Sequence, residues 1–354
     1  MAGLAGYCVG DLSIPTHAIA GEGSFDAYPS NLANPLSILI GASNGASDYG
    51  NKFGEPLLGG FTRTGELLHN TERRAWLKPI MFSAGIGQLR DEHVHKEKPK
   101  KGMVVIAIGG PMYRIGVGGG SASSVGAGDQ SAELDFNAVQ RGDPEMQQKV
   151  NRVVHACVDL GAHNPILSIH DQGAGGPCNV LTELVEPEGA RINLRAIGVG
   201  DSTLSVLEIW GAESQERNAL LVDETRVSEF EALCARERVP CEILGNITGD
   251  GRIVLFDAHQ NKNHVDLELE KILGKLPQKT FTSEHPDVTE ADAEQYKFAQ
   301  DVSIKSLTEK VFSLPGVGSK NFLVHKVDRS VGGLTVQQQC VGPLQLPVAD
   351  CAVP

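Results

Sequence analysis

The chain has 354 residues, and its 31 Lys and Arg against 44 Asp and Glu give a net charge of −13. At about 100–200 residues per domain, this length predicts at least two globular units. The negative charge argues against nucleic acid or an anionic membrane surface as a partner. No window approaches 18 uninterrupted apolar residues, and the first residues lack a secretory signal, which favours a soluble protein of the cytoplasm.

The cysteine and glycine contents further limit the kind of protein that this sequence can encode. The seven cysteines form an odd set without a C-x-x-C pair, which argues against a disulfide framework or a zinc site and fits a reducing cytosol. Glycine makes up about 12% of the chain, 41 residues in 354, against a usual share of roughly 7%. These glycines come in short clusters, which indicate tight turns or loops where the backbone closely approaches a ligand.

The first 90 residues are expected to combine a strand with a glycine loop. The apolar run over 35–41 predicts the strand, and the glycine-rich stretch over 41–54 predicts the loop that follows it. Backbone N–H groups of such a loop can converge on phosphate oxygens, and Lys52 adds a positive charge. A long surface loop without a ligand is an equally good interpretation.

A mixed α+β unit is expected after the charged stretch 90–101. Alternating apolar and turn residues predict its strands at 103–108, 166–169, 219–222, 241–244 and 252–256. Apolar residues at helical spacing predict its helices at 144–160 and 227–237, with another that follows Gly176. The polar stretch 258–302 predicts a connection around one helix at 267–273, and a further segment begins near residue 303.

Three more motifs could bind a ligand. Gly118–Gly120 follow Arg114 and can form an anion-binding nest, although a hairpin or bulge fits equally well. Asp171 ends a predicted strand just before glycines that open a helix, an arrangement that can hold Mg²⁺ against phosphates or merely cap the helix. Gln140 and the Glu213–Gln215 triplet place amide, carboxylate and hydroxyl groups at the ends of elements, where they could bind a polar small molecule or act as caps.

Seven motifs occur in one order along nearly the whole chain. They are Ala46–Pro56, Lys78–Ser83, Gly116–Gly120, Asp135-Phe136 with Val139–Met146, His170–Gly176, Glu213–Arg217 and Asp328–Gly333. Together they resemble the large, multidomain phosphoribosylformylglycinamidine synthase family. The resemblance implies an α+β, aminoimidazole-ribonucleotide-synthetase-like fold. In it, residues 1–95 end a first N-terminal-type sheet domain, 96–258 form a C-terminal-type α/β domain, 259–302 are a linker, and 303–354 begin a second sheet domain.

The resemblance also implies a reaction of purine biosynthesis. ATP phosphorylates the amide oxygen of formylglycinamide ribonucleotide, and ammonia from a glutaminase domain displaces phosphate from the iminophosphate to give formylglycinamidine ribonucleotide. The expected ligands are therefore formylglycinamide ribonucleotide, ATP, Mg²⁺ and ammonia, with neither nucleic acid nor a membrane as a partner.

Carried over residue by residue, the resemblance assigns roles to two groups of residues and one metal ligand. Asp171 is the expected Mg²⁺ ligand, and Gln140, Glu213, Ser214 and Gln215 are the expected substrate-binding residues. The expected ATP-binding residues are Gly41, Asn44, Gly45, Asp48, Tyr49, Gly50, Asn51, Lys52, Phe53, Gly118, Gly119 and Gly120.

Two segments of the family pattern do not appear in the sequence. They are a Glu-Thr-His-Asn segment that carries the catalytic His and a Gly-Gly-x-x-Arg-Asp segment whose Asp helps to bind Mg²⁺. No catalytic residue is therefore assigned in this chain, and we expect an internal fragment that is inactive alone. The alternatives are a related ATP-dependent enzyme, such as aminoimidazole ribonucleotide synthetase, and a non-catalytic nucleotide-binding or scaffold protein.

Overall fold

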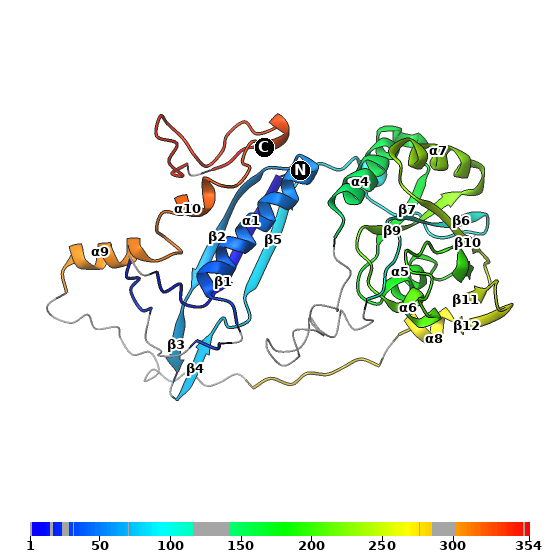
Figure 1. Ribbon diagram of the computed structural model, residues 1–354, viewed down its shortest axis with the longest axis horizontal. Helices are drawn as coiled ribbons and strands as arrows, with labels where there is room; N and C mark the ends of the chain where they lie inside the picture. Colours follow the sequence, from blue (N-terminus) through cyan, green and yellow to red (C-terminus); the bar gives the residue numbers. More distant parts are fainter. Residues whose placement is uncertain are drawn as a thin grey trace. The chain divides into compact units, whose positions relative to one another are not determined.

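The structure is a computed structural model. It describes residues 2–14, 17–22, 28–30, 32–69, 71–115, 142–275, 277–284, 302–349 and 351–354. The chain divides into two compact units, of which the first comprises Met1–Gln88 with Pro277–Pro354 and the second Leu89–Leu276 (Figure 1). Within the described residues, no helix combines the length and apolar composition that crossing a membrane requires.

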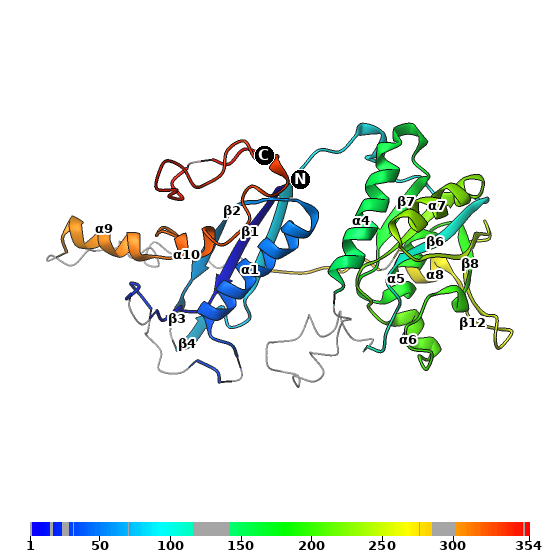
Figure 2. The ribbon, with the colours of Figure 1, turned by 45° about the horizontal axis from the view of Figure 1, so that its top comes forward.

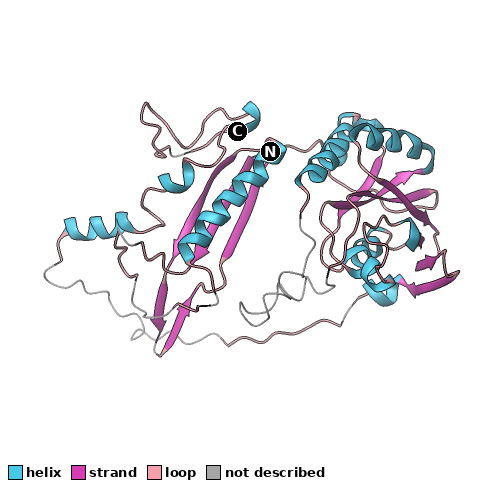
Figure 3. Ribbon diagram, in the orientation of Figure 1, coloured by secondary structure: helices cyan, strands magenta, loops and turns pink. Residues whose placement is uncertain are grey.

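The first unit is built on a sheet with one long helix along it. Its described part contains the sheet order β2-β1-β5, with β1 (Ala2–Val9) parallel to β2 (Leu57–Thr64) and antiparallel to β5 (Ile80–Ile86). β3 (Glu66–His69) and β4 (Glu72–Ala75) form a separate antiparallel pair (Figure 3). The helix α1 (Pro35–Phe53) lies along β1, where Leu39 packs with alternate β1 side chains in the core (Figure 1).

The expectation of a strand over 35–41 followed by a glycine loop is wrong, because α1 is a continuous helix. The Asn34 side chain caps it by accepting the Leu36 N–H at 2.9 Å, and Pro35 occupies the first turn, where its missing N–H costs nothing. Gly54, with φ +73°, ends the helix in the left-handed conformation. The apolar residues alone are compatible with a strand, but the capping residues at both ends and the packing on β1 favour a helix.

The C-terminal stretch packs on this same unit. It contains α9 (Ile304–Ser313) and α10 (Asn321–Val324). The Thr62 hydroxyl donates to the Pro315 carbonyl at 2.6 Å, and the Asp328 N–H donates to the Ser47 hydroxyl at 2.9 Å. Residues 1–88 and 302–354 therefore share one compact unit, although the sequence assigned them to two domains. That assignment to family domains stays a prediction.

The second unit is a mixed sheet that is covered on both faces. In the described part of the chain the sheet order is β12-β11-β8-β10-β6-β9-β7, with antiparallel pairs throughout except for parallel β11 and β8. The strands are β6 (Met103–Gly109), β7 (Ile166–Asp171), β8 (Gly189–Asn193), β9 (Arg217–Asp223), β10 (Cys241–Ile247), β11 (Arg252–Asp257) and β12 (Lys262–Glu268). The helices are α4 (Pro144–Asp159), α5 (Gly176–Leu184), α6 (Val206–Gly211), α7 (Val227–Glu237) and α8 (Leu269–Leu273).

The central strand β6 divides the core of this unit into two clusters. Met103, Val105 and Ala107 face one cluster with side chains of α5 and α6. The alternate residues face the other cluster with α4 and α7, which lie side by side (Figure 2). Because both faces are covered, every residue of β6 is buried. The strands expected in this unit and its expected helices at 144–160 and 227–237 are confirmed.

β12 was missed and occupies the start of the expected linker. It pairs antiparallel with β11, and α8 begins only at Leu269. Its residues are mostly polar and exposed, because an edge strand takes its hydrogen bonds from one neighbour and need not bury a face.

Asp257 stabilises the turn before β12. Its carboxylate is buried, and it accepts hydrogen bonds from Arg195 Nε at 2.9 Å and from the His259 N–H at 2.8 Å. The Arg195 hydrogen bond is the main reason that the pKa of Asp257 lies well below its usual range.

Two glycines of α1 provide a test of its helical conformation. A Cβ at Gly41 would meet no atom within 4 Å outside the helix backbone nearby, whereas a Cβ at Gly50 would lie 2.5 Å from the Glu55 carbonyl oxygen. We expect Gly41→Ala to raise the free energy of unfolding by about 0.5–1 kcal/mol, because alanine is the better helix former. Gly50→Ala should lower it, and urea denaturation measures both. Equal destabilisation by the two substitutions would contradict the helix.

Candidate functional site

Two sequence motifs, Glu213–Arg217 and His170–Gly176, meet beside the end of β6 at one edge of the sheet in the second unit. β9 runs antiparallel to β6 and β7, so its first residues lie beside the last residues of both neighbours. Gly109 pairs with Arg217 at the end of β6, and Asp171 lies opposite the next residue of β9. The Gln172 N–H donates to the Arg217 carbonyl at 3.0 Å. The Glu213–Gln215 segment, which directly precedes β9, is thereby held close to the loop after Asp171.

A buried ion pair fixes the start of β9. The Arg217 side chain is 1% exposed and that of Glu242, on β10, is 9% exposed. The Arg217 guanidinium donates to both Glu242 carboxylate oxygens and to the Gly110 carbonyl. Gly198 leaves room for this carboxylate, since a Cβ there would lie 2.3 Å from Glu242 Oε1. Three stretches of chain are therefore held together by one guanidinium.

The loop between Asp171 and α5 approaches the same segment from the other side. Gly176 has φ +59°, and a Cβ on it would lie 2.3 Å from the Ala212 carbonyl oxygen. Only glycine allows this approach at that conformation. The first turn of α5 therefore rests directly on the backbone that leads into Glu213.

The Glu213–Gln215 triplet combines partly exposed and fully buried polar groups. Gln215 Nε2 donates to Glu213 Oε1 at 3.4 Å, and burial raises the pKa of Glu213. The Ser214 side chain is fully buried, and its Oγ has no hydrogen-bond partner among the described residues. The same holds for Nε2 of the neighbouring Gln172. A buried polar group without a partner costs about 1–3 kcal/mol, which a ligand or a rearrangement that supplied a partner would recover.

Asp171 stands at the end of β7 with its side chain 90% exposed. It does not cap α5, because the N-cap residue is Gly175 and no side chain bonds there; the helix-cap alternative is therefore wrong. Its neighbour His170 is held by Glu183, with Nε2 3.0 Å from Glu183 Oε2. Among the described residues, no three His, Cys, Asp or Glu side chains gather as a metal site. A single carboxylate fits Mg²⁺ as one ligand of a set completed by phosphate oxygens and water.

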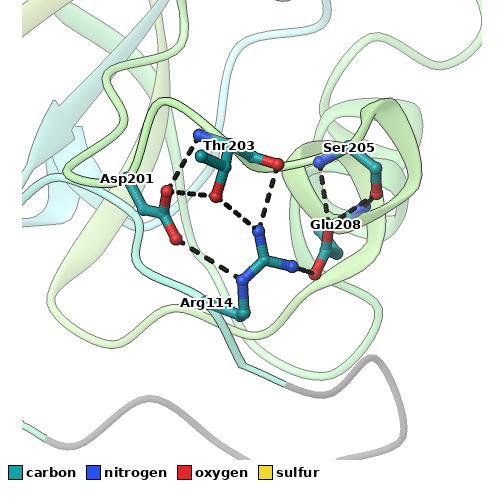
Figure 4. A network of polar contacts seen from close by, with 5 residues as sticks. All are labelled: Arg114, Asp201, Thr203, Ser205 and Glu208. Atoms are coloured by element: carbon teal, nitrogen blue, oxygen red, sulfur yellow. Dashed lines mark hydrogen bonds and ion pairs between the residues drawn. The ribbon is translucent and has the colours of Figure 1, made fainter.

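Arg114, which precedes Gly118–Gly120 by four positions in the sequence, is bound by side chains of its own unit (Figure 4). Its guanidinium pairs with Asp201 at 3.4 Å and with Glu208, and donates to the Thr203 hydroxyl at 2.7 Å. Hydrogen bonds from Thr203 lower the pKa of Asp201, and those from Ser205 lower the pKa of Glu208, with Arg114 adding to both. Both carboxylates are thus held ionised around Arg114, so its charge is largely neutralised before any anion arrives.

The helical conformation of α1 changes what its residues can do. Within a helix the interior N–H groups bond to carbonyls one turn earlier, so they cannot converge on a phosphate. The expected anion-binding loop over 41–54 is therefore wrong as a backbone site. Its polar and aromatic side chains contact one another: Tyr49 packs edge-on against Phe53 with ring centroids 5.1 Å apart, and Lys52 Nζ lies 4.9 Å from the Tyr49 centroid.

A cavity of about 590 Å³ runs along this helix within the first unit. Gly45, Tyr49 and Gly50 of α1 line one side, and Met81 and Gly85 of β5 line the other. Of the residues expected to bind ATP, these three of α1 thus share one cavity, and its walls are mainly apolar.

Comparison with known proteins shows what the chain is similar to. A family model described as "AIR synthase related protein, C-terminal domain" matches residues 100–258, and one described as "FGAR-AT PurM_N-like domain" matches 319–354. Over its whole length the chain is 53% identical to a probable phosphoribosylformylglycinamidine synthase, chloroplastic/mitochondrial, of Arabidopsis thaliana. It is likewise 52% identical to the phosphoribosylformylglycinamidine synthase of Homo sapiens. The chain matches an internal part of a phosphoribosylformylglycinamidine synthase.

The chain spans only about a quarter of these synthases, 26% of the Arabidopsis protein and 27% of the human one. Solved structures of more distant relatives have the same fold. The structure titled PurLQS from Thermotoga maritima aligns with a TM-score of 0.62 at 17% identity, covering 95% of this chain and 46% of that one. That titled T. maritima PurL complexed with FGAR aligns with a TM-score of 0.58 at 20% identity, covering 81% and 41%. The expected synthetase-like fold is confirmed.

The structure brings together some of the residues expected from the synthase family. Glu213–Gln215 and Asp171 lie at one sheet edge, as described above. Gly118–Gly120 and Gln140 lie outside the described residues. Sequence reasoning missed Arg217 and Glu242 as the pair that holds this edge. Arg217 was quoted within a motif, but no local signal links it to a carboxylate 25 positions later on another strand.

The buried pair is testable by removing one partner. We expect Glu242→Ala to lower the free energy of unfolding by about 3–5 kcal/mol, because it leaves the Arg217 guanidinium buried without a counter-charge. The matched control is Glu229→Ala, which breaks a half-exposed pair with Arg226 and should cost at most about 0.5 kcal/mol. Both are measured by urea denaturation. A cost for Glu242→Ala no larger than the control would show that the pair does not hold the edge.

Proposed function

We propose that this chain serves in the ATP- and glutamine-dependent conversion of formylglycinamide ribonucleotide to formylglycinamidine ribonucleotide, a ligase reaction of purine biosynthesis. Its match to an internal part of such synthases along its whole length supports this proposal. The structural observation that carries it is the sheet edge where Glu213–Gln215 meets the loop after Asp171, with buried polar atoms that lack partners within the part of the chain that the structure describes.

The chemistry explains why ATP is needed. An amide oxygen is a poor leaving group, so ATP transfers its γ-phosphoryl group to that oxygen and leaves as ADP. Ammonia then forms a C–N bond at the same carbon, and the C–O bond breaks to release phosphate. The protein's main contribution is to hold the amide, the phosphoryl group and the ammonia in line while excluding water.

The Glu213–Gln215 triplet, together with Gln140, is the part of the chain that we assign to the ribonucleotide. Gln215 offers a carboxamide with both donors and an acceptor, which suits the amide groups of the substrate. Glu213 is partly buried and accepts hydrogen bonds. Ser214 would gain a hydrogen-bond partner for its buried hydroxyl from the bound substrate.

For ATP, we assign the contribution of α1 to side chains such as Tyr49 and Lys52, because its interior N–H groups are used within the helix. Gly118–Gly120 remain the proposed backbone contact for phosphate. Asp171 is the proposed Mg²⁺ ligand, and Mg²⁺ when bound would neutralise charge on the phosphates. Ammonia would come from a glutaminase domain, and the reaction would take place in the cytosol. The substrate assignment is supported by the T. maritima PurL described as complexed with FGAR, which shares this fold.

Aminoimidazole ribonucleotide (AIR) synthetase is the second candidate. The family model that matches residues 100–258 is described as an AIR synthase related protein. Identity of 44–53% along the whole chain to named phosphoribosylformylglycinamidine synthases favours the first proposal.

Substitution of Ser214 tests the substrate assignment with a distinctive pair of effects. We expect Ser214→Ala to raise the free energy of unfolding by about 1 kcal/mol, because it removes a buried hydroxyl without a partner. The same substitution should weaken formylglycinamide ribonucleotide binding by about tenfold, as the loss of one hydrogen bond implies. Urea denaturation and calorimetric titration measure the two effects.

Ser205→Ala is the matched control for this experiment. The Ser205 hydroxyl bonds to Glu208 in the capping box of α6, so its loss should destabilise the chain and leave ribonucleotide affinity unchanged. Wild-type ribonucleotide affinity in the Ser214→Ala chain would remove Ser214 from the site.

Asp171 is tested by the metal dependence of nucleotide binding. We expect the wild-type chain to bind ATP more tightly with Mg²⁺ than with EDTA, and Asp171→Ala to remove that difference. Asp159→Ala, which alters another exposed carboxylate of the same unit, should retain it. Calorimetric titration measures the ATP affinity of each chain with Mg²⁺ and with EDTA. If Asp171→Ala still binds ATP more tightly with Mg²⁺, to the same extent as wild type, the assignment of Asp171 is contradicted.

A further inference from the structure

Glu216 connects the proposed substrate triplet to a second part of the site. It directly follows Gln215, and its side-chain Oε2 accepts the Asp143 N–H at 3.0 Å. A Cβ on the neighbouring Gly142 would lie 3.0 Å from Glu216 Oε1. Both carboxylate oxygens thus lie against the turn that begins α4, where Asp143 is the N-cap.

The backbone of Glu216 is held as firmly as its side chain. Its φ is +57°, a left-handed conformation that residues other than glycine adopt at a cost. The Glu216 carbonyl oxygen packs against Gly109, where a Cβ would lie only 2.0 Å away. Arg217, the next residue, is fixed by the buried pair with Glu242. Strain at a residue fixed from both sides indicates that its exact position matters.

From this geometry we infer that Glu216 is a positioning residue for the ribonucleotide: it sets the distance between the Glu213–Gln215 triplet and the Gly142–Asp143 turn. The inference rests on the proposed function. Gln140, the other proposed substrate-binding residue, precedes Gly142 by two positions in the sequence. Glu216 therefore ties the triplet to the Gly142–Asp143 turn, although nothing assigns Glu216 itself a contact with substrate.

The alternative is that Glu216 only stabilises the start of α4. A purely structural role would change the free energy of unfolding but not the affinity of the folded chain for its ligand. A positioning role would change affinity for the ribonucleotide and leave ATP binding as it is. Ligand affinity therefore separates the two roles.

The experiment titrates the 354-residue chain and its variants with formylglycinamide ribonucleotide and, separately, with ATP. We expect Glu216→Ala to weaken ribonucleotide binding by about tenfold through loss of the bond to Asp143, with ATP binding unchanged. Glu216→Gln keeps an oxygen that can accept the Asp143 N–H, and should bind within about threefold of wild type. If Glu216→Ala does not fold, Glu216→Asp, which is one methylene shorter, takes its place with the same expected loss.

Glu145→Ala is the matched control, because Glu145 lies in the first turn of the same helix and is exposed, paired with Lys149. It removes the same charge near the turn and should bind the ribonucleotide as wild type does. Wild-type ribonucleotide affinity in Glu216→Ala would overturn the positioning role, as would a Glu216→Gln chain that binds as weakly as Glu216→Ala. Absence of ribonucleotide binding by the unsubstituted chain would instead overturn the proposed function, and this inference with it.

Discussion

The buried pair of Arg217 and Glu242 is the constraint on which the candidate site depends. A guanidinium that is 1% exposed is tolerated because a carboxylate meets its charge, and because its two terminal nitrogens donate to that carboxylate and to the Gly110 carbonyl. Those partners come from β10 and from the chain just after β6, so satisfying one side chain aligns three strands at the same edge. This arrangement therefore also determines where the Glu213–Gln215 triplet lies.

Glycines allow the other segments to reach that edge. Gly109 and Gly176 both have positive φ, and at both a Cβ would overlap a backbone carbonyl of the segment between α6 and β9. The glycine enrichment of the chain is thus used here for close approach between backbones. A small ligand would be bound between loops whose spacing is set by main-chain contact, and such loops have little freedom to adjust.

The first unit uses small residues for a different purpose. α1 buries Leu39, Ser43 and Ser47 along one stripe, which lets the helix lie close to the sheet. Gly41 and Gly45 are exposed, whereas Gly50 is partly buried beside the Glu55 carbonyl. The glycines of this chain therefore have two structural effects. In the second unit they allow close approach between backbones, and in the first unit they weaken α1 without breaking it.

The sequence by itself determined the class of the second unit, most of its strands, the helices α4 and α7, and the resemblance to the synthase family. These follow from local periodicity and from ordered motifs, which need no knowledge of distant contacts. Tertiary structure alone decided the rest. α1 is a helix because a sheet covers its buried stripe, and β12 is a strand because β11 supplies its hydrogen bonds. Arg217 is paired with Glu242 because the fold places both side chains together on neighbouring strands and buries them. A buried charge needs a counter-charge, and only the folded chain supplies it.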